Sequence, residues 1–425
     1  MRTAGLFSGA VAAILGCCMI CSNTYARSRL NSLLVLGTKL NSEGHYRAAI
    51  DLLSPDPSDS VTGPMAFILG TSYAALNDFK NARHFLQTAV DLEPERIGYR
   101  FQLGRLLVQV SLAGEAAEQY GVILKQDSTF LPAIYQLGLL MYERRDYPRA
   151  AGYFQQIVRL NPRDFLSQYY LGACYATMER PDSARYVLSA CVTLQPTYTP
   201  AVALLASLYF AQPDFRQALR LYTRAVQLRP DNADLHYREG ICHEKLADYR
   251  EALRAFLLAI KNDTAHVHAF AHLGQVFFQI GEYDSAITAY EHAVRLEEDN
   301  PSLLVNIALA WERQDSIERA AQAFERAVRA CQPDQIARLY NQLAALRFNA
   351  KQFRNAKEAY QRSLQVDPSC IPARFFLAVT CDQLKEYGSA RAAYRSFLRQ
   401  AGSDSNYAEK VRTVRSRLEA LGRRH

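Results

Sequence analysis

Small apolar residues return along most of the chain with a period of 34 residues. Alanine stands at eight positions with this spacing, and three further alanines continue the series with slips of one or two residues. A period of this length in a chain of 425 residues indicates a structure built from stacked repeats. The marker alanines are Ala49, Ala82, Ala116, Ala150, Ala184, Ala218, Ala252, Ala286, Ala320, Ala356 and Ala390.

Other columns keep fixed distances from the marker alanines. Gly or Ala stands twelve residues before them, as at Gly104, and a large, usually aromatic residue stands four after them, as at Tyr120. Small residues let two helix backbones approach closely, and the ring fills the remaining gap from the same helical face. Proline twelve residues after the alanine, as at Pro94, ends a second helix because it has no amide hydrogen. Each unit is therefore predicted to be a helix–turn–helix that buries its apolar face by stacking on neighbours.

Turn signals separate the two helices of a unit, for example Asn77-Asp78-Phe79 and Gly281-Glu282-Tyr283. In the first unit, Ser54-Pro55-Asp56-Pro57 is predicted to cut the second helix short. Four units lack the closing proline, and we expect looser turns where they end, at Ser128, Thr264, Glu298 and Gln332.

These columns resemble the tetratricopeptide repeat family, and the resemblance covers Leu30 to about Asp404. It implies an all-α fold, an α-solenoid in which about eleven helix-turn-helix units over residues 30–404 form a right-handed superhelix. A basic capping helix is predicted over residues 405–425, since a solenoid needs a cap on its last open face. Its apolar positions at helical spacing are Tyr407, Val411, Val414, Leu418 and Leu421.

Residues 1–26 have a different pattern. Arg2 precedes an apolar run from Leu6 to Ile20, and small or polar residues follow as far as Ala26, which is typical of a secretory signal peptide cleaved after Ala26. The stretch ending at Cys17 resembles a bacterial lipobox, so lipidation of Cys17 is one alternative. A retained anchor is another, although the run is marginal for spanning a membrane. We therefore expect an exported protein of the periplasm or outer membrane, with any membrane attachment through the N-terminus.

The formal net charge of +7 is unevenly placed, because residues 391–425 contain nine Lys or Arg against three acidic residues. The rest of the chain is nearly neutral, which argues against a nucleic-acid-binding surface. Beyond the targeting segment there is no CxxC pair, so no structural zinc is predicted. The remaining cysteines could form disulfides, but their positions on apolar helix faces favour buried thiols. They are Cys174, Cys191, Cys242, Cys331, Cys370 and Cys381.

Repeats and cap occupy the chain beyond the targeting segment, leaving no stretch for a catalytic domain. The sequence contains no glycine-rich phosphate loop, GxSxG or HExxH motif. We therefore predict a protein that is not an enzyme and needs no cofactor. His268 and His272 share a helical face, but a third ligand is not evident, so no metal site is predicted.

The resemblance implies that the first helix of each unit lines a concave groove, where partners bind as extended segments or helices. The groove residues would then lie about fifteen and fourteen places before each marker alanine, and the N-terminal half has an aromatic stripe there. The opposing interpretation is that these rings only pack between adjacent helices. The residues predicted to contact a protein or peptide partner are Phe67, Phe101, Arg105, Tyr135, Gln136, Tyr169, Tyr170, Arg238 and His272.

The preferred function is a non-catalytic protein-interaction scaffold of the cell envelope. The first groove column contains no Lys or Arg, which argues against binding of chaperone C-terminal tails. The alternative is a module that binds an envelope glycan or a peptidoglycan fragment, since flat tyrosine rings suit sugar rings. Its stacking platform would be Tyr135, Tyr142, Tyr169 and Tyr170.

Overall fold

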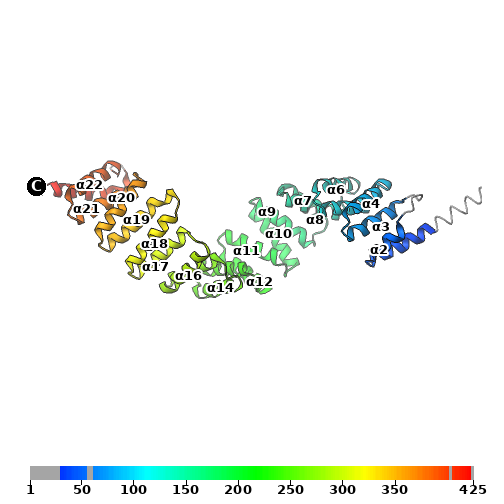
Figure 1. Ribbon diagram of the computed structural model, residues 1–425, viewed down its shortest axis with the longest axis horizontal. Coiled ribbons are helices and arrows are strands. Elements are labelled where there is room, and N and C mark those ends of the chain that lie inside the picture. The colour runs from blue at the N-terminus through cyan, green and yellow to red at the C-terminus, as the bar shows by residue number, and fades with distance from the viewer. Residues whose placement is uncertain (1–28, 55–60, 402–403, 423–425) are drawn as a thin grey trace, which may run out of the picture. The chain divides into compact units, whose positions relative to one another are not determined.

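The computed structural model describes residues 29–54, 61–401 and 404–422, and every regular element among them is a helix (Figure 1). The predicted all-α solenoid of stacked helix pairs is thereby confirmed. The predicted targeting segment, with Cys17, lies outside the described residues. Of the helices that are described, none is long and apolar enough to cross a membrane. The chain divides into two compact units, unit 1 (Met1–Ala201) and unit 2 (Val202–His425), and the division falls inside α11 (Thr199–Ala211).

Unit 1 begins with a helix over residues 29–42 and a short α2, whose length agrees with the predicted interruption. From α3 to α22 the odd-numbered helices are the first helix of each pair and the even-numbered ones the second. The helices of unit 1 are α2 (Tyr46–Leu53), α3 (Gly63–Ala75), α4 (Phe79–Leu92), α5 (Ile97–Gln109), α6 (Ala113–Gln126), α7 (Leu131–Glu143), α8 (Tyr147–Leu160), α9 (Phe165–Thr177) and α10 (Pro181–Leu194).

Unit 2 continues the same alternation and ends in a 3-10 turn, Ser405–Tyr407, followed by α23. Its helices are α12 (Phe215–Leu228), α13 (Ala233–Lys245), α14 (Tyr249–Asn262), α15 (Val267–Gln279), α16 (Tyr283–Leu296), α17 (Pro301–Arg313), α18 (Ile317–Ala330), α19 (Pro333–Asn349), α20 (Phe353–Val366), α21 (Ile371–Gln383), α22 (Tyr387–Ala401) and α23 (Ala408–Gly422).

Close helix contact explains the small-residue columns. All eleven marker alanines are fully buried. A Cβ atom added to Gly104 would lie 2.6 Å from Cε1 of Tyr120, and one added to Gly240 would lie 2.6 Å from Cε1 of Phe256. The glycine and the ring four residues after the marker alanine therefore fit together within a unit, and a side chain at the glycine would displace the ring.

The turns inside the units follow the sequence signals. Asn77 adopts a left-handed backbone conformation with φ of 61°, and Gly281 does the same with φ of 87°. The Asp78 side chain then caps α4 by accepting a hydrogen bond from the backbone amide of Asn81 at 3.2 Å. A left-handed residue followed by a capping residue reverses the chain in the short space between paired helices.

The units without a closing proline do not have delayed helix ends. Helices α6 and α14 end two residues before Ser128 and Thr264, just as α4 ends two residues before Pro94. Asp127 stops α6 by accepting a hydrogen bond from the amide of Thr129 at 2.9 Å. Asp263 does the same for the amide of Ala265 at 3.0 Å. These aspartate turns replace proline, so the looser turns that we expected do not occur there.

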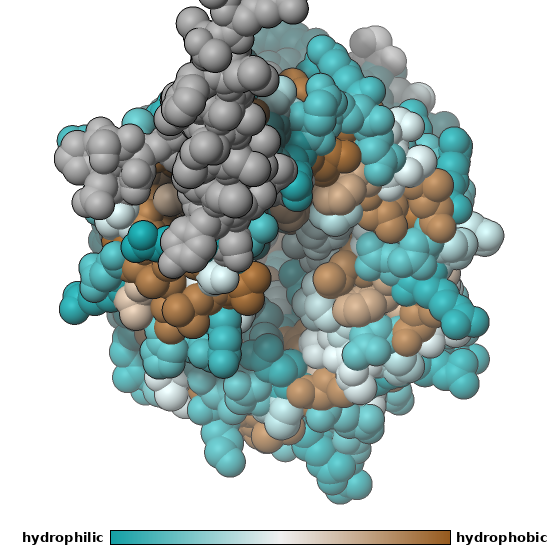
Figure 2. Space-filling model, turned by 90° about the vertical axis from the view of Figure 1, so that its right-hand side faces the viewer, coloured by the Kyte–Doolittle hydropathy of each residue, from teal (hydrophilic) through white to brown (hydrophobic). Residues whose placement is uncertain are grey.

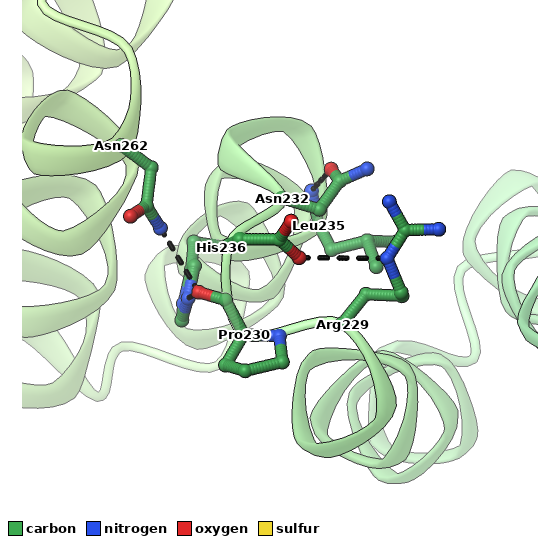
Figure 3. Close-up of polar contacts among 7 residues, drawn as sticks. Arg229, Pro230, Asn232, Leu235, His236 and Asn262 are labelled. Carbon is green, nitrogen blue, oxygen red and sulfur yellow. Dashed lines mark hydrogen bonds and ion pairs between the residues drawn. The ribbon is translucent and has the colours of Figure 1, made fainter.

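A closing proline also connects successive helix pairs. The carbonyl oxygen of Pro230 accepts a hydrogen bond from Nδ2 of Asn262 at 3.0 Å and lies 3.0 Å from Nε2 of His236 (Figure 3). Because a carbonyl can only accept, the His236 ring carries its proton on Nε2. Nε of Arg229 lies 3.4 Å from Oδ1 of Asp231, two residues further along the chain. The turn is thus fixed by side chains from both sides of the repeat boundary.

Helix α23 packs against the last pair of helices. Val411, Val414 and Leu421 are buried in one cluster with residues of α21 and α22. Arg417 donates two hydrogen bonds to the carboxylate of Asp382, from Nε at 2.6 Å and from Nη2 at 2.8 Å. The Asp382 side chain is only 9% exposed, so α23 neutralises a nearly buried charge as well as covering apolar surface.

Candidate partner-binding face of unit 1

The predicted aromatic stripe occupies one place on successive first helices. Phe67 lies in α3, Phe101 in α5, Tyr135 in α7 and Tyr169 in α9, and all four side chains are half-buried. On the surface seen in Figure 2, apolar residues form small patches between hydrophilic ones. We call the surface made by these four rings and their neighbours on the first helices the stripe face.

The stripe rings contact aromatic residues of the next helix pair. Phe67 stacks on Tyr99 with ring centroids 4.7 Å apart, and Tyr169 meets Tyr198 edge to face at 5.2 Å. Such contacts hold the rings in place and account for the buried half of each side chain. The exposed half leaves surface for a partner, so packing and recognition are compatible at these positions.

Tyr170 has a different environment from the stripe residues. Its ring stacks on that of Phe154 with centroids 5.1 Å apart and planes 14° apart. The rings of Tyr135 and Tyr142 meet the Tyr170 ring edge to face, with centroids 6.2 and 5.4 Å apart. A sugar-binding platform needs an open ring face, and these contacts cover much of the Tyr170 ring. Tyr170 therefore packs against the preceding helix pair and supports Tyr135 from there.

The tyrosines of the stripe face stay uncharged over the ordinary pH range. Burial raises the pKa of Tyr135 to about 12, and burial is also the first cause of the raised pKa values of Tyr142 and Tyr169. The hydroxyl groups consequently keep their protons and can donate hydrogen bonds to a bound chain. The face thus combines apolar rings with neutral donors.

Polar predicted residues flank the stripe. Arg105 is exposed on α5 and donates a long hydrogen bond, 3.4 Å from Nη1, to Oε1 of Gln102. Gln136 is half-buried on α7 beside Tyr135. Sequence reasoning missed the residues that build a pocket around Arg105, notably Thr71 and Gln109. A signal existed, because Thr71 stands eleven residues before its marker alanine, as Arg105 does before the next.

The other two predicted residues belong to unit 2. Arg238 is exposed on α13, whereas His272 of α15 is half-buried, with Nδ1 2.8 Å from Oε2 of Glu244. The Glu244 side chain is only 7% exposed, and the His272 ring meets that of Tyr237 at 5.5 Å. Sequence reasoning missed Glu244, a nearly buried carboxylate that engages His272. Among the described residues, no three or more His, Cys, Asp or Glu side chains gather in a way that could hold a metal ion.

Stacked helix pairs define the class of α-helical repeat proteins. Models of the tetratricopeptide repeat match residues 64–96, 135–199, 204–267, 272–335 and 341–405, which is more than half of the chain. The protein belongs to the tetratricopeptide repeat family. Repeats of this family generally mediate protein–protein interactions and are generally not catalytic.

Curated relatives match over parts of their length. The BBSome complex member BBS4 of Bos taurus is 25% identical over 221 residues, covering 42% of this chain and 43% of that protein. Its homologue in Drosophila melanogaster is 22% identical over 181 residues, covering 42% and 37%. Lipopolysaccharide assembly protein B of Haemophilus influenzae is 22% identical over 174 residues, covering 38% and 43%. The chain therefore spans less than half of the length of each of these relatives.

Parts of the chain are similar to solved structures. The C-terminal part of a repeat-containing protein from Cytophaga hutchinsonii is 14% identical with a TM-score of 0.46, covering 65% of this chain and 98% of that one. The structure of Pseudomonas aeruginosa pilF is 21% identical with a TM-score of 0.40, covering 51% and 99%.

Proposed function

We propose that this protein is a non-catalytic scaffold of the cell envelope that binds a segment of a partner protein on the stripe face of unit 1. The observation that carries the proposal is the recurrence of a half-buried ring at one place on four successive first helices. Rings fixed by neighbours lose little conformational freedom when a partner binds, which suits them as anchors. An anchor of this kind contributes about 2 kcal/mol or more to binding.

The envelope location rests on the N-terminal sequence. Residues 1–26 have the charged start, apolar run and small-residue exit of a signal peptide. If the segment is cleaved, mature protein begins near Arg27. If Cys17 is lipidated, a fatty-acid analogue labels the protein, and the label is lost in Cys17→Ser. Cytoplasmic protein that keeps Met1 would contradict export without touching the proposed binding face.

Site-specific crosslinking tests the binding face in the native cell. A photoreactive amino acid at Gln136 places the probe beside Tyr135, and the same probe at Gln155, which is exposed on the second helix α8, is the matched control. We expect a discrete crosslinked product from position 136 and none from position 155. Equal products from both positions, or none from either, would contradict binding on the stripe face.

A further inference from the structure

A pocket opens on unit 1 beside the stripe, between α3 and α5. It has a volume of about 360 Å³, and the buried side chains of Leu86 and Leu106 form its base. Its remaining lining is rich in hydrogen-bonding groups. We call it the Arg105 pocket, and it is lined by Thr71, Ala74, Ala75, Asn77, Leu86, Gln102, Arg105, Leu106 and Gln109.

The charge of this pocket is not balanced by its own residues. In the part of the chain that the structure describes, the lining contains one cation, Arg105, and no carboxylate. The protein partner of the guanidinium is the neutral Gln102, whose oxygen accepts the bond at 3.4 Å. That bond leaves the NH₂ group of Gln102 as a further donor beside Arg105.

A buried phenol lies close behind the cation. Tyr120 is fully buried, and its hydroxyl has no hydrogen-bond partner among the described residues. Burial raises the pKa of this tyrosine to about 12, while the nearby charge of Arg105 acts in the opposite direction. Tyr120 is therefore uncharged and does not neutralise Arg105. The positive charge of Arg105 remains available to an anionic group of a partner.

We propose that the Arg105 pocket receives the carboxylate side chain of an Asp or Glu within the partner segment; this rests on the proposed function. A planar guanidinium can bind both oxygens of a carboxylate, and the amides of Gln102 and Gln109 add donors around it. Hydrogen bonds between a guanidinium and a carboxylate are charge-assisted, and such bonds are stronger than those between neutral groups. The exposed guanidinium reaches such a group without rearrangement of the helices.

The spacing of the helices sets the register of that segment. Successive first helices are separated by at least the roughly 8–10 Å of directly packed helices, and an extended chain advances about 3.3 Å per residue, so each step from one helix pair to the next corresponds to at least about three residues. Tyr135 lies one first helix beyond Arg105, and Tyr169 lies two beyond. The acidic residue should therefore stand at least about three residues from one apolar anchor and at least about six residues from the other.

Peptide selection tests this without knowledge of the partner. The full chain is used to select from a phage library of random twelve-residue peptides that are fused through their C-termini and so present no free terminal carboxylate. The same selection is made with Arg105→Met, which keeps the length of the side chain, and with Arg159→Met, an exposed charge control on α8. We expect an acidic residue at the predicted spacing with the native chain and with Arg159→Met, but not with Arg105→Met.

Binding of one selected peptide, made with a C-terminal amide, is then measured. Replacing its acid by Gln, or using Arg105→Met, should each weaken binding on the order of tenfold, and the two changes together should add little to either alone. Adding a free C-terminal carboxylate to the Gln peptide should not restore affinity. Restoration by that terminus, or additive losses, would overturn the assignment to an acidic side chain.

The same selection separates this inference from the proposed function. Peptides that require Tyr135 but carry no acidic residue would overturn the carboxylate pocket and leave the stripe face standing. Peptides that bind equally well to Tyr135→Ala would contradict the stripe face itself. Because Arg105 is exposed and its hydrogen bond to Gln102 is long, we expect Arg105→Met to unfold at the same temperature as the native chain; equal unfolding temperatures would show that misfolding is not the cause of a loss of binding.

Discussion

Two glycines of α5 should respond in opposite ways to the same substitution. A Cβ atom at Gly104 would lie 2.6, 2.9 and 3.2 Å from three carbon atoms of the Tyr120 ring, and that ring is fully buried. Because the ring has no open space into which to move, Gly104→Ala overpacks the α5–α6 contact and should cost about 1–3 kcal/mol. Gly98 has nothing within 4 Å of the added atom, so Gly98→Ala should stabilise the helix by up to about 1 kcal/mol.

Amide hydrogen exchange is the suitable assay, because repeats open locally and a single global unfolding energy is poorly defined for such a chain. Gly104→Ala should lower the protection of α5 and α6 and leave that of α20 and α21 unchanged. Gly98→Ala should raise or maintain protection in α5. Equal effects of the two substitutions would refute the close-approach reasoning, as would native protection in Gly104→Ala.

Three further outcomes follow from buried groups. Arg417→Met leaves the nearly buried Asp382 carboxylate without its guanidinium and should cost about 1–3 kcal/mol of local stability, measured as faster amide hydrogen exchange in α21 and α23, while Arg412→Met on the exposed side of α23 should cost little; equal losses would contradict the pairing. The pKa of Tyr135 is raised from 10.0 to about 12, so the folded chain keeps a proton that the unfolded chain loses, and the urea midpoint should fall as pH rises from about 10 to 12. A flat profile would contradict this. Burial raises the pKa of the Cys174 thiol to about 12, so iodoacetamide at pH 8 should modify it far more slowly in the native chain than in urea, whereas equal rates would place it in solvent.

The repeat architecture could be predicted from the sequence because it depends on short-range rules. The marker alanines and the glycines twelve residues before them report how closely two helices approach, and Gly104 against Tyr120 shows that contact in the structure. The turn ending at Asp78 was readable for the same reason, since its cap uses residues three apart. The closing turns at Ser128 and Thr264 were misjudged because Asp127 and Asp263 fix the ends of these helices where proline is missing.

The details of the candidate site were less predictable because they depend on contacts between successive helix pairs. Phe101 and Tyr135 were placed on the right helices by their spacing, but the stacking of Tyr170 on Phe154 depends on how one pair of helices sits on the next. The pairing of His272 with Glu244 joins residues 28 positions apart, and a repeat pattern does not specify which polar side chains meet across that distance. The repeat spacing assigns each residue to a place on a helix, whereas the side chains that it contacts can be read only from the folded structure.

The proposed recognition by the stripe face is tested most directly by comparing two tyrosines of unit 1. Tyr135 lies on the stripe face, whereas Tyr186 on the second helix α10 is 81% exposed. Crosslinking from Gln136 is measured in the native chain and with each tyrosine replaced by alanine, while circular dichroism follows folding. We predict that Tyr135→Ala abolishes the crosslinked product, while the variant protein keeps its helical content and loses little thermal stability. Tyr186→Ala should give the same crosslinked product as the native chain. Undiminished crosslinking in Tyr135→Ala together with a large loss of stability would contradict recognition and assign this ring to packing alone.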